Sequence, residues 1–100
     1  MNIFFNKKIL IYGLGKSGQS TFKFLKNKSN VLLYDDYKSK IKSFNFKKKV
    51  KNYKDIIKSN FDYIILSPGI DINNCKLVNY LKKNRKKIHT DLDIFFKSYT

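Results

Sequence analysis

Three short segments of the sequence carry residue types that could bind a phosphorylated ligand. The first, Gly13-Leu14-Gly15-Lys16-Ser17-Gly18, fits the pattern G-x-G-x-x-G. It lies between an apolar run at 8–12 and a stretch with helical periodicity, which is the context in which this pattern has a mechanism. The first glycine would permit a tight turn, the second would let a phosphate approach the backbone, and the third would let the helix pack closely on the strand. The N–H groups and positive dipole end of the helix would then face the anion, with Lys16 adding a cation and Ser17 a hydroxyl donor. A plain strand-to-helix turn is the alternative interpretation.

The second segment is the acidic pair Asp35 and Asp36, which follows another apolar run at 31–34. A carboxylate about 20 residues past such glycines normally accepts hydrogen bonds from a ribose or a base. Two adjacent carboxylates would repel a 2′-phosphate, so NADP is disfavoured. The alternative is that one carboxylate caps the following segment, which we expect more of Asp36 than of Asp35.

The third segment, Ser67-Pro68-Gly69-Ile70, follows the run at 61–66. Proline and glycine would fix a narrow turn, and the serine would offer a hydroxyl. In an open parallel sheet, ligands bind at the carboxyl ends of the strands, where the strand order reverses. We therefore predict that residues near positions 15, 35 and 68 meet along one rim and hold a nucleotide.

Nothing in the sequence predicts catalysis or a metal site in this chain. His89 is the only histidine, and we expect it to be a packed or partly exposed structural residue and not a ligand. No acid and base can be paired, and the phosphate-loop pattern G-x-x-x-x-G-K-[ST] is absent. The segments above therefore predict a domain that binds a ligand and does not react with it.

The composition fits one globular domain spanning residues 1–100, with 42% hydrophobic residues. The net charge of +15 suggests a nucleic-acid binder, but Arg85 is the only arginine and the lysines are scattered, so we expect solvated faces and no nucleic-acid partner. Cys75 is the only cysteine, which excludes an intramolecular disulfide and favours the reducing cytoplasm. The run at 9–12 is too short to cross a membrane, and no membrane partner is expected.

The strands and helices that would position these three segments are predicted to alternate along the chain. Apolar runs predict strands at 8–12, 31–34 and 61–66, a short edge strand at 47–50 and a last strand at 87–89. Helical stripes predict helices over 17–26, near 53–57, near 77–81 and near 92–96. Within the first helix we expect Gly18, Thr21, Phe22 and Leu25 to face the core. This alternation predicts an α/β fold with parallel strands and helices on both faces of the sheet.

Taken in order, four segments resemble the N-terminal domain of the Mur ligases, in particular of those that add D-glutamate to UDP-N-acetylmuramoyl-L-alanine. They are residues 11–18 (IYGLGKSG), 34–36 (YDD), 66–70 (LSPGI) and 91–95 (DLDIF). The LSPGI and DLDIF segments are more specific than the glycine loop, which NAD enzymes share. Two positions depart from the family: Thr90 stands where a small residue is usual, and Lys16 stands where an apolar residue is common.

The resemblance implies a Rossmann-like, five-stranded parallel sheet in the order 3-2-1-4-5. It places the glycine loop near the diphosphate of a UDP-sugar, Asp35 to Tyr37 near the uridine, and Ser67 to Gly69 along the same nucleotide. The candidate binding residues are Gly13, Gly15, Lys16, Ser17, Gly18, Asp35, Asp36, Tyr37, Ser67, Pro68 and Gly69.

The resemblance also implies a cytoplasmic, ATP-dependent ligase of peptidoglycan synthesis, and we expect a monomer. In the family, ATP and Mg²⁺ are bound by a central domain and D-glutamate by a third, both of which we expect after Thr100. ATP phosphorylates the substrate carboxylate, and the amine of D-glutamate attacks the acyl phosphate. The alternative for this chain is an NAD-binding or nucleotide-sensing module, which rests on the glycine loop and Asp35 alone.

Overall fold

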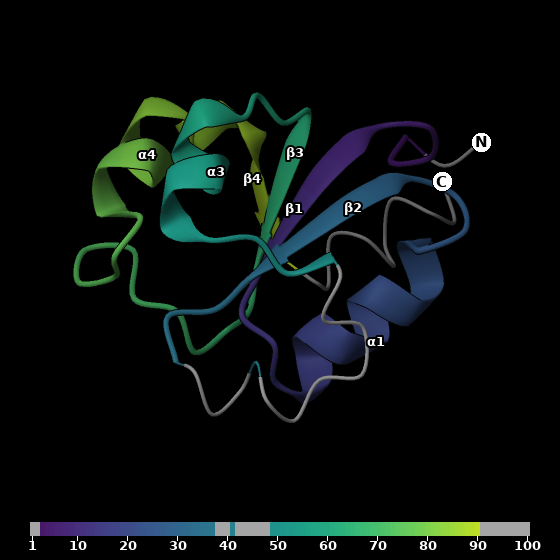
Figure 1. Ribbon diagram of the computed structural model, residues 1–100, viewed down its shortest axis with the longest axis horizontal. Coiled ribbons are helices and arrows are strands. Elements are labelled where there is room, and N and C mark those ends of the chain that lie inside the picture. Colours follow the sequence, from purple (N-terminus) through teal and green to yellow (C-terminus); the bar gives the residue numbers. More distant parts are fainter. Residues whose placement is uncertain (1–2, 38–40, 42–48, 91–100) are drawn as a thin grey trace.

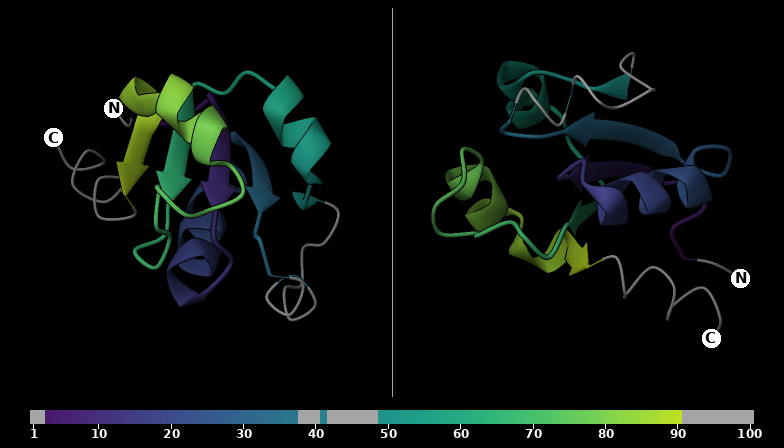
Figure 2. Two further views of the ribbon diagram at one scale, coloured as in Figure 1. Left: turned by 90° about the vertical axis from the view of Figure 1, so that its left-hand side faces the viewer. Right: turned by 90° about the horizontal axis from the view of Figure 1, so that it is seen from below.

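The computed structural model describes residues 3–37, 41 and 49–90, which form an α/β fold (Figure 1). Its parallel strands are β1 (Lys8–Tyr12), β2 (Asn30–Tyr34), β3 (Tyr63–Leu66) and β4 (Ile88–Thr90). Its helical elements are α1 (Lys16–Leu25), α3 (Tyr53–Lys58), α4 (Val78–Lys83) and the 3-10 turn η2 (Arg85–Lys87). The strand order is β2-β1-β3-β4, and the arrowheads of these strands point the same way in the left view of Figure 2.

Strand β1 lies inside the sheet, between β2 and β3. Leu10 pairs with Leu32 on one side and with Ile64 on the other. The side chains of residues 9–12 have no exposed surface. A strand covered on both faces needs apolar residues at successive positions, so the continuous run in the sequence correctly predicted this strand.

Alternate residues of β1 belong to two cores, one on each face of the sheet. Ile9 and Ile11 pack with residues of α1, whereas Leu10 and Tyr12 pack with residues of α3 and α4. Figure 1 shows α1 on one side of the strands and α3 and α4 on the other. The prediction of helices on both faces is confirmed.

Helix α1 begins at Lys16, one residue before the predicted start. Its buried residues are the predicted stripe of Gly18, Thr21, Phe22 and Leu25. The 3.6-residue period therefore identified both the helix and its inner face.

The helix predicted from Tyr53, Ile56 and Ile57 is present as α3, but the core buries only one of these three residues. Ile56 is buried, whereas Tyr53 and Ile57 are 43% and 41% exposed. The helix has six residues and begins after Asn52, whose side chain accepts a hydrogen bond from the Asp55 N–H at 2.8 Å. Because so short a helix makes fewer than two turns, a single position can face the sheet while its neighbours stay exposed.

The five-stranded order is not confirmed, because the described residues form a four-stranded sheet. The relative order of these four agrees with the prediction. Val50 makes one parallel bridge to Leu33, on the outer side of β2 where the fifth strand was expected. The predicted helix near 92–96 and the acidic segment 91–95 lie outside the described residues.

Candidate functional site

The carboxyl ends of β1 and β3 form the switch point of the sheet. From β1 the chain moves to β2 on one side, and it then crosses back to β3 on the other side. The loops that follow β1 and β3 therefore lead to opposite faces, which leaves a crevice between them. A cavity of about 300 Å³ occupies this place, and we call it the three-loop cavity. Its lining residues are Gly13, Gly15, Lys16, Ser17, Asp35, Tyr37, Ser67, Pro68, Gly69 and Ile70.

Nine of the eleven candidate residues line this cavity, so the predicted meeting of the three loops is confirmed. Gly18 and Asp36 do not line it. Ile70 does, and sequence reasoning left it out of the candidate list although it belongs to the LSPGI segment. Binding of a ligand by these residues remains a prediction.

The glycines of the first loop have different structural roles. Gly13 has φ +106°, a conformation that side chains rarely adopt. A Cβ atom on Gly18 would lie 1.9 Å from the Gly13 carbonyl oxygen, so the helix packs as closely as predicted. A Cβ atom on Gly15 would meet nothing within 4 Å, which leaves open space beside the backbone at the start of α1.

Ser67 joins the third loop to the first. Its hydroxyl donates a hydrogen bond to the Gly13 carbonyl oxygen at 3.1 Å, and its N–H donates to the Tyr12 carbonyl oxygen at 3.1 Å. A Cβ atom on Gly13 would lie 2.6 Å from the Ser67 Oγ, so the serine fills the space that this glycine leaves. The two loops are thus fixed against each other.

Asp35 joins the second loop to the first. Its Oδ2 accepts a hydrogen bond from the Leu14 N–H at 2.7 Å, and its Oδ1 accepts one from the Tyr37 N–H at 2.8 Å. The residue is 7% exposed. The expectation that capping concerns Asp36 more than Asp35 is wrong, since it is Asp35 that accepts the N–H two residues further along.

Asp36 turns away from the three-loop cavity. Its Oδ2 accepts hydrogen bonds from the Tyr12 hydroxyl at 2.6 Å and from the Lys76 N–H at 3.3 Å. Its Oδ1 is buried and has no hydrogen-bond partner among the described residues. Asp36 lines a neighbouring cavity of about 210 Å³ together with Cys75. Successive side chains of an extended chain point to opposite sides, which explains why the two carboxylates separate.

The two tyrosines next to Asp36 are hydroxyl donors at neutral pH. Burial, and then the hydrogen bond to Asp36, raise the pKa of Tyr12 far above its ordinary value. Burial, and then the negative charge of Asp36, raise the pKa of Tyr34 to about 12. Sequence reasoning missed Tyr12, although a hydroxyl on a fully buried strand just before the glycines signals a polar partner.

Lys16 is the cationic side chain of the three-loop cavity. It is the first residue of α1, and no acidic residue lies in the first turn of this helix. The positive end of the helix dipole is therefore not neutralised by a carboxylate of its own helix. Helix dipole and lysine together favour an anion beside the open backbone at Gly15.

His89 is packed as predicted. Its ring makes edge contacts with Phe4 and Tyr63, at centroid distances of 5.5 and 5.2 Å. Within the described ranges, no group of three His, Cys, Asp or Glu residues could hold a metal ion. In the same part of the chain, none of the helices is both long enough and apolar enough to traverse a bilayer.

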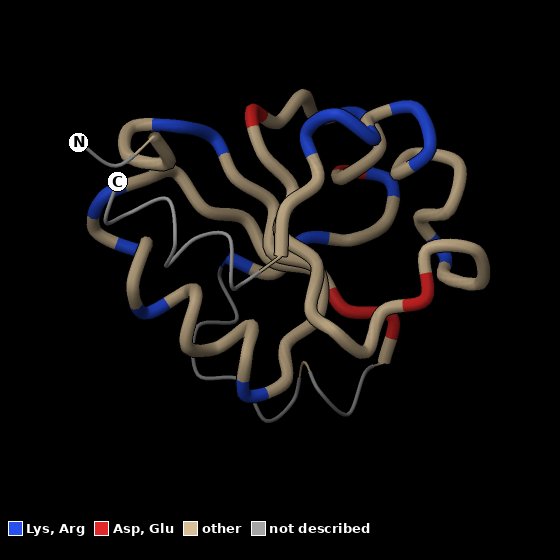
Figure 3. The backbone as a smooth tube through the Cα atoms, turned by 180° about the vertical axis from the view of Figure 1, so that it is seen from behind, with Lys and Arg blue, Asp and Glu red and all other residues tan. Residues whose placement is uncertain are grey.

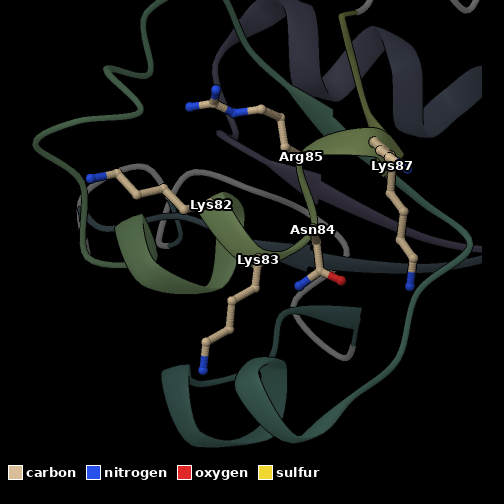
Figure 4. A pocket seen from close by; sticks show the side chains of 6 residues that line it. Lys82, Lys83, Asn84, Arg85 and Lys87 are labelled. Atoms are coloured by element: carbon tan, nitrogen blue, oxygen red, sulfur yellow. The ribbon is translucent and has the colours of Figure 1, made fainter.

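A second hollow, of about 450 Å³, lies at the amino ends of the strands, before the start of β4. Its lining residues are Lys82, Lys83, Asn84, Arg85, Lys86 and Lys87, which we call the basic turn. Figure 3 shows basic positions spread along the top, the left side and the bottom of the molecule, and acidic positions both at the lower right and in the upper part. In Figure 4, Lys82, Lys83 and Arg85 point in different directions. Side chains that diverge in this way do not form a cage for one small anion.

Comparison with known proteins gives a consistent family match. Residues 7–89 match the family model described as Mur ligase MurD-like, N-terminal domain. The chain is 36% identical over 99 residues to a UDP-N-acetylmuramoylalanine–D-glutamate ligase of Rickettsia conorii, covering 96% of this chain and 20% of that protein. It is 33% identical over 100 residues to the enzyme of the same name from Rickettsia bellii, covering 97% and 22%. The chain thus spans about a fifth of the length of these relatives.

Among solved structures, the fold is similar to that of a UDP-D-quinovosamine 4-dehydrogenase from Vibrio fischeri. The TM-score is 0.56 at 20% identity, covering 85% of this chain and 75% of the other. At this identity, the likeness concerns the fold alone.

Proposed function

Because this chain belongs to the family of Mur ligase MurD-like N-terminal domains, we propose that its three-loop cavity binds the uridine diphosphate part of UDP-N-acetylmuramoyl-L-alanine. In this proposal, the chain is the substrate-binding domain of an ATP-dependent ligase that joins D-glutamate to this precursor during peptidoglycan synthesis. The observation that carries the proposal is the single cavity in which the glycine loop, residues 35–37 and residues 67–70 meet.

The charges and the free space of the cavity suit a diphosphate at one end. The start of α1, the open backbone at Gly15 and the Lys16 side chain all lie on the same loop. Phosphate oxygens placed there would face the positive end of the helix dipole. The uridine would then extend towards Tyr37, which is 68% exposed and has an aromatic face available for the base. A volume of about 300 Å³ is at the lower end for ligand pockets and suits the nucleotide part of the substrate.

The proposal assigns only substrate binding to this chain. The residues present do not fit ATP and Mg²⁺, because the sequence contains no G-x-x-x-x-G-K-[ST] loop and the described residues contain no metal-binding group. By the proposal, ATP, Mg²⁺ and D-glutamate are bound by other parts of a ligase of which this chain represents about a fifth, as in its relatives.

Thermal denaturation with and without nucleotides tests the proposal, because a ligand that binds only the folded state raises the melting temperature. We expect UDP and UDP-N-acetylmuramoyl-L-alanine to raise it, and NAD to leave it unchanged. The proposal would be abandoned if NAD raised the melting temperature and both uridine nucleotides did not.

The variant Gly15→Val tests whether UDP binds in the three-loop cavity. The added side chain meets nothing in the free protein, so the fold should persist with a small cost at the start of the helix. It would occupy the space proposed for the phosphates, so UDP binding should be lost. Gly15→Ala should reduce affinity less than Gly15→Val, and the control Lys86→Gln should leave it unchanged. Equal UDP affinity in Gly15→Val and the wild type would place the nucleotide elsewhere.

A further inference from the structure

Tyr12 places a hydroxyl group at a fixed point next to the loop that follows β2. It is the last residue of β1, where it pairs with Tyr34 of β2 and with Leu66 of β3. Its side chain has no exposed surface and packs in the core on the α3 and α4 side of the sheet. Because strands hold its backbone on both sides and the core holds its ring, the hydroxyl has little freedom to move.

Asp36 is the partner of this hydroxyl. The Tyr12 hydroxyl donates to Asp36 Oδ2 at 2.6 Å, and the Lys76 N–H donates to the same oxygen at 3.3 Å. Asp36 Oδ1 is buried and has no hydrogen-bond partner among the described residues. A short bond from a hydroxyl to a carboxylate is charge-assisted and is stronger than a bond between neutral groups. Of the two described bonds to Asp36, the one from Tyr12 therefore contributes more to holding the carboxylate.

The orientation of Asp36 determines that of its two neighbours. Asp36 points to the Tyr12 side and lines the smaller cavity of about 210 Å³. Asp35 points to the other side and lines the three-loop cavity, and Tyr37 lies between the two cavities and lines both. A rotation of this segment that released Asp36 would turn Asp35 out of the three-loop cavity. It would also bring the Asp36 carboxylate towards a bound diphosphate, which it would repel.

We propose that Tyr12 is a positioning residue, which holds the segment after β2, through its hydrogen bond to Asp36, in the orientation that lets Asp35 and Tyr37 face the nucleotide. Tyr12 does not contact the ligand, because its side chain lies wholly within the core. The inference deepens the proposed function and rests on it for the identity of the ligand. The orientation of the segment itself can be measured without a ligand.

Two tyrosine variants separate positioning from stability. Tyr12→Phe removes the hydroxyl and keeps the ring. Tyr80→Phe is the matched control, because the Tyr80 hydroxyl also makes a partly buried hydrogen bond, to the Ser59 carbonyl oxygen at 2.8 Å, and its ring packs against the same core. Neither Tyr80 nor Ser59 lines the three-loop cavity. Both variants should lose stability, so an effect confined to Tyr12→Phe must come from the segment after β2.

Titration with UDP, at a temperature at which each variant is fully folded, is the first measurement. We expect Tyr12→Phe to bind UDP roughly tenfold more weakly, which is the loss expected if about a tenth of the molecules keep the binding orientation. Tyr80→Phe should bind UDP as the wild type does. Unchanged affinity of Tyr12→Phe, or an equal loss in Tyr80→Phe, would overturn the proposal.

Two substitutions of Asp36 test the same hydrogen bond from its other side. Asp36→Asn keeps an oxygen that can accept the Tyr12 hydroxyl, whereas Asp36→Ala does not, and the two variants have the same charge. We expect Asp36→Ala to bind UDP roughly tenfold more weakly than Asp36→Asn. Adding Tyr12→Phe to Asp36→Ala should cause no further loss, since both changes remove the same interaction. Equal affinity of the two Asp36 variants, or additive losses in the double variant, would overturn the proposal, and the first of these comparisons holds even if Tyr12→Phe does not fold.

Amide hydrogen exchange in the ligand-free full chain is the last measurement. The Tyr37 N–H donates to Asp35 Oδ1 at 2.8 Å, so its exchange rate reports the orientation of this segment. We expect the Tyr37 amide to exchange roughly tenfold faster in Tyr12→Phe than in Tyr80→Phe. Equal rates would overturn the positioning role. If the wild type bound no UDP, the proposed function would fail, while this comparison would still decide whether Tyr12 positions the segment.

Discussion

The polar groups at the carboxyl ends of the strands and those at the amino ends are used in different ways. At the carboxyl ends of the strands, hydrogen bonds join segments that are 21 and 54 residues apart, from Leu14 to Asp35 and from Ser67 to Gly13. At the amino ends, the basic turn presents long cationic side chains that point in different directions (Figure 4). The first edge has a cavity with fixed walls, and the second has a solvated surface. A net charge of +15 therefore says little about where a ligand binds in this protein.

Substitutions can test this difference between the carboxyl ends and the amino ends of the strands. If the carboxyl edge is rigidly built, small substitutions there should change stability or binding. Substitutions of the same kind in the basic turn should change neither, and small substitutions at positions without close neighbours should leave stability unchanged.

The largest expected effect is that of Gly18→Ala. Alanine is the better helix former by about 1 kcal/mol, so helix propensity alone predicts stabilisation. The structure predicts the opposite sign, because the added Cβ would lie 1.9 Å from the Gly13 carbonyl oxygen. We expect a loss of at least about 2 kcal/mol in the free energy of unfolding, measured by denaturant titration. Gly69→Ala, whose Cβ would meet nothing within 4 Å, should stay within about 0.5 kcal/mol of the wild type. A stabilised Gly18→Ala variant would show that α1 does not pack this closely.

Tyr12→Phe should have the next largest effect. It removes the hydroxyl that donates to Asp36 Oδ2 at 2.6 Å, in a place where the other oxygen of the carboxylate is buried without a described partner. Leaving such a group unsatisfied costs about 1–3 kcal/mol. Denaturant titration should show this loss, and Tyr37→Phe, at a residue that is 68% exposed, should show almost none. Equal stability of the two variants would mean that the Tyr12 hydrogen bond contributes nothing.

The dependence of stability on alkaline pH tests the second tyrosine next to Asp36, which is Tyr34. The pKa of Tyr34 rises from 10.0 to about 12 on folding. A raised pKa means that the folded state keeps the Tyr34 proton to a higher pH than the unfolded state does. The resulting contribution of Tyr34 to the free energy of unfolding is fully present below pH 10 and is lost as the pH rises through about 12. Tyr34→Phe should therefore lose less stability across this interval than the wild type, as followed by unfolding at fixed pH. Lysine deprotonation affects both proteins alike, and Tyr37→Phe should follow the wild type. Parallel curves for Tyr34→Phe and the wild type would contradict the raised pKa.

Local patterns predicted much of this architecture because their causes are local. The run at 9–12 had to be a buried strand, since each of its side chains is apolar and both faces of the sheet are covered. The stripe from Gly18 to Leu25 was visible as helical spacing. The meeting of the three loops followed from topology, because parallel strands place their carboxyl ends at one edge.

What the sequence could not give depends on contacts between distant residues. Asp35 and Asp36 are chemically identical, and only the orientation of the chain after β2 decides that one faces Leu14 and the other Tyr12. The apolar positions Tyr53, Ile56 and Ile57 suggested a helix, but in a helix of six residues the core buries Ile56 and leaves the other two exposed. Whether Val50 makes a single bridge or a full strand depends on its partner β2, which local propensity does not describe.

The smallest expected effect shows whether UDP binding depends on the charge of Lys16 or on the net charge of the protein. Lys16→Gln and Lys86→Gln each remove one positive charge from exposed residues, the first in the three-loop cavity and the second in the basic turn. If the cavity binds the diphosphate, Lys16→Gln should weaken UDP binding about two- to fivefold at low salt, the usual range for an exposed charge pair. The difference should shrink as salt screens the interaction. Lys86→Gln should match the wild type at every salt concentration, because its charge lies at the opposite edge of the sheet. Calorimetric titration of UDP into both variants measures the effect. An equal loss in the two would mean that UDP responds to the overall charge of the protein, and the distinction between the two edges would then have no bearing on binding.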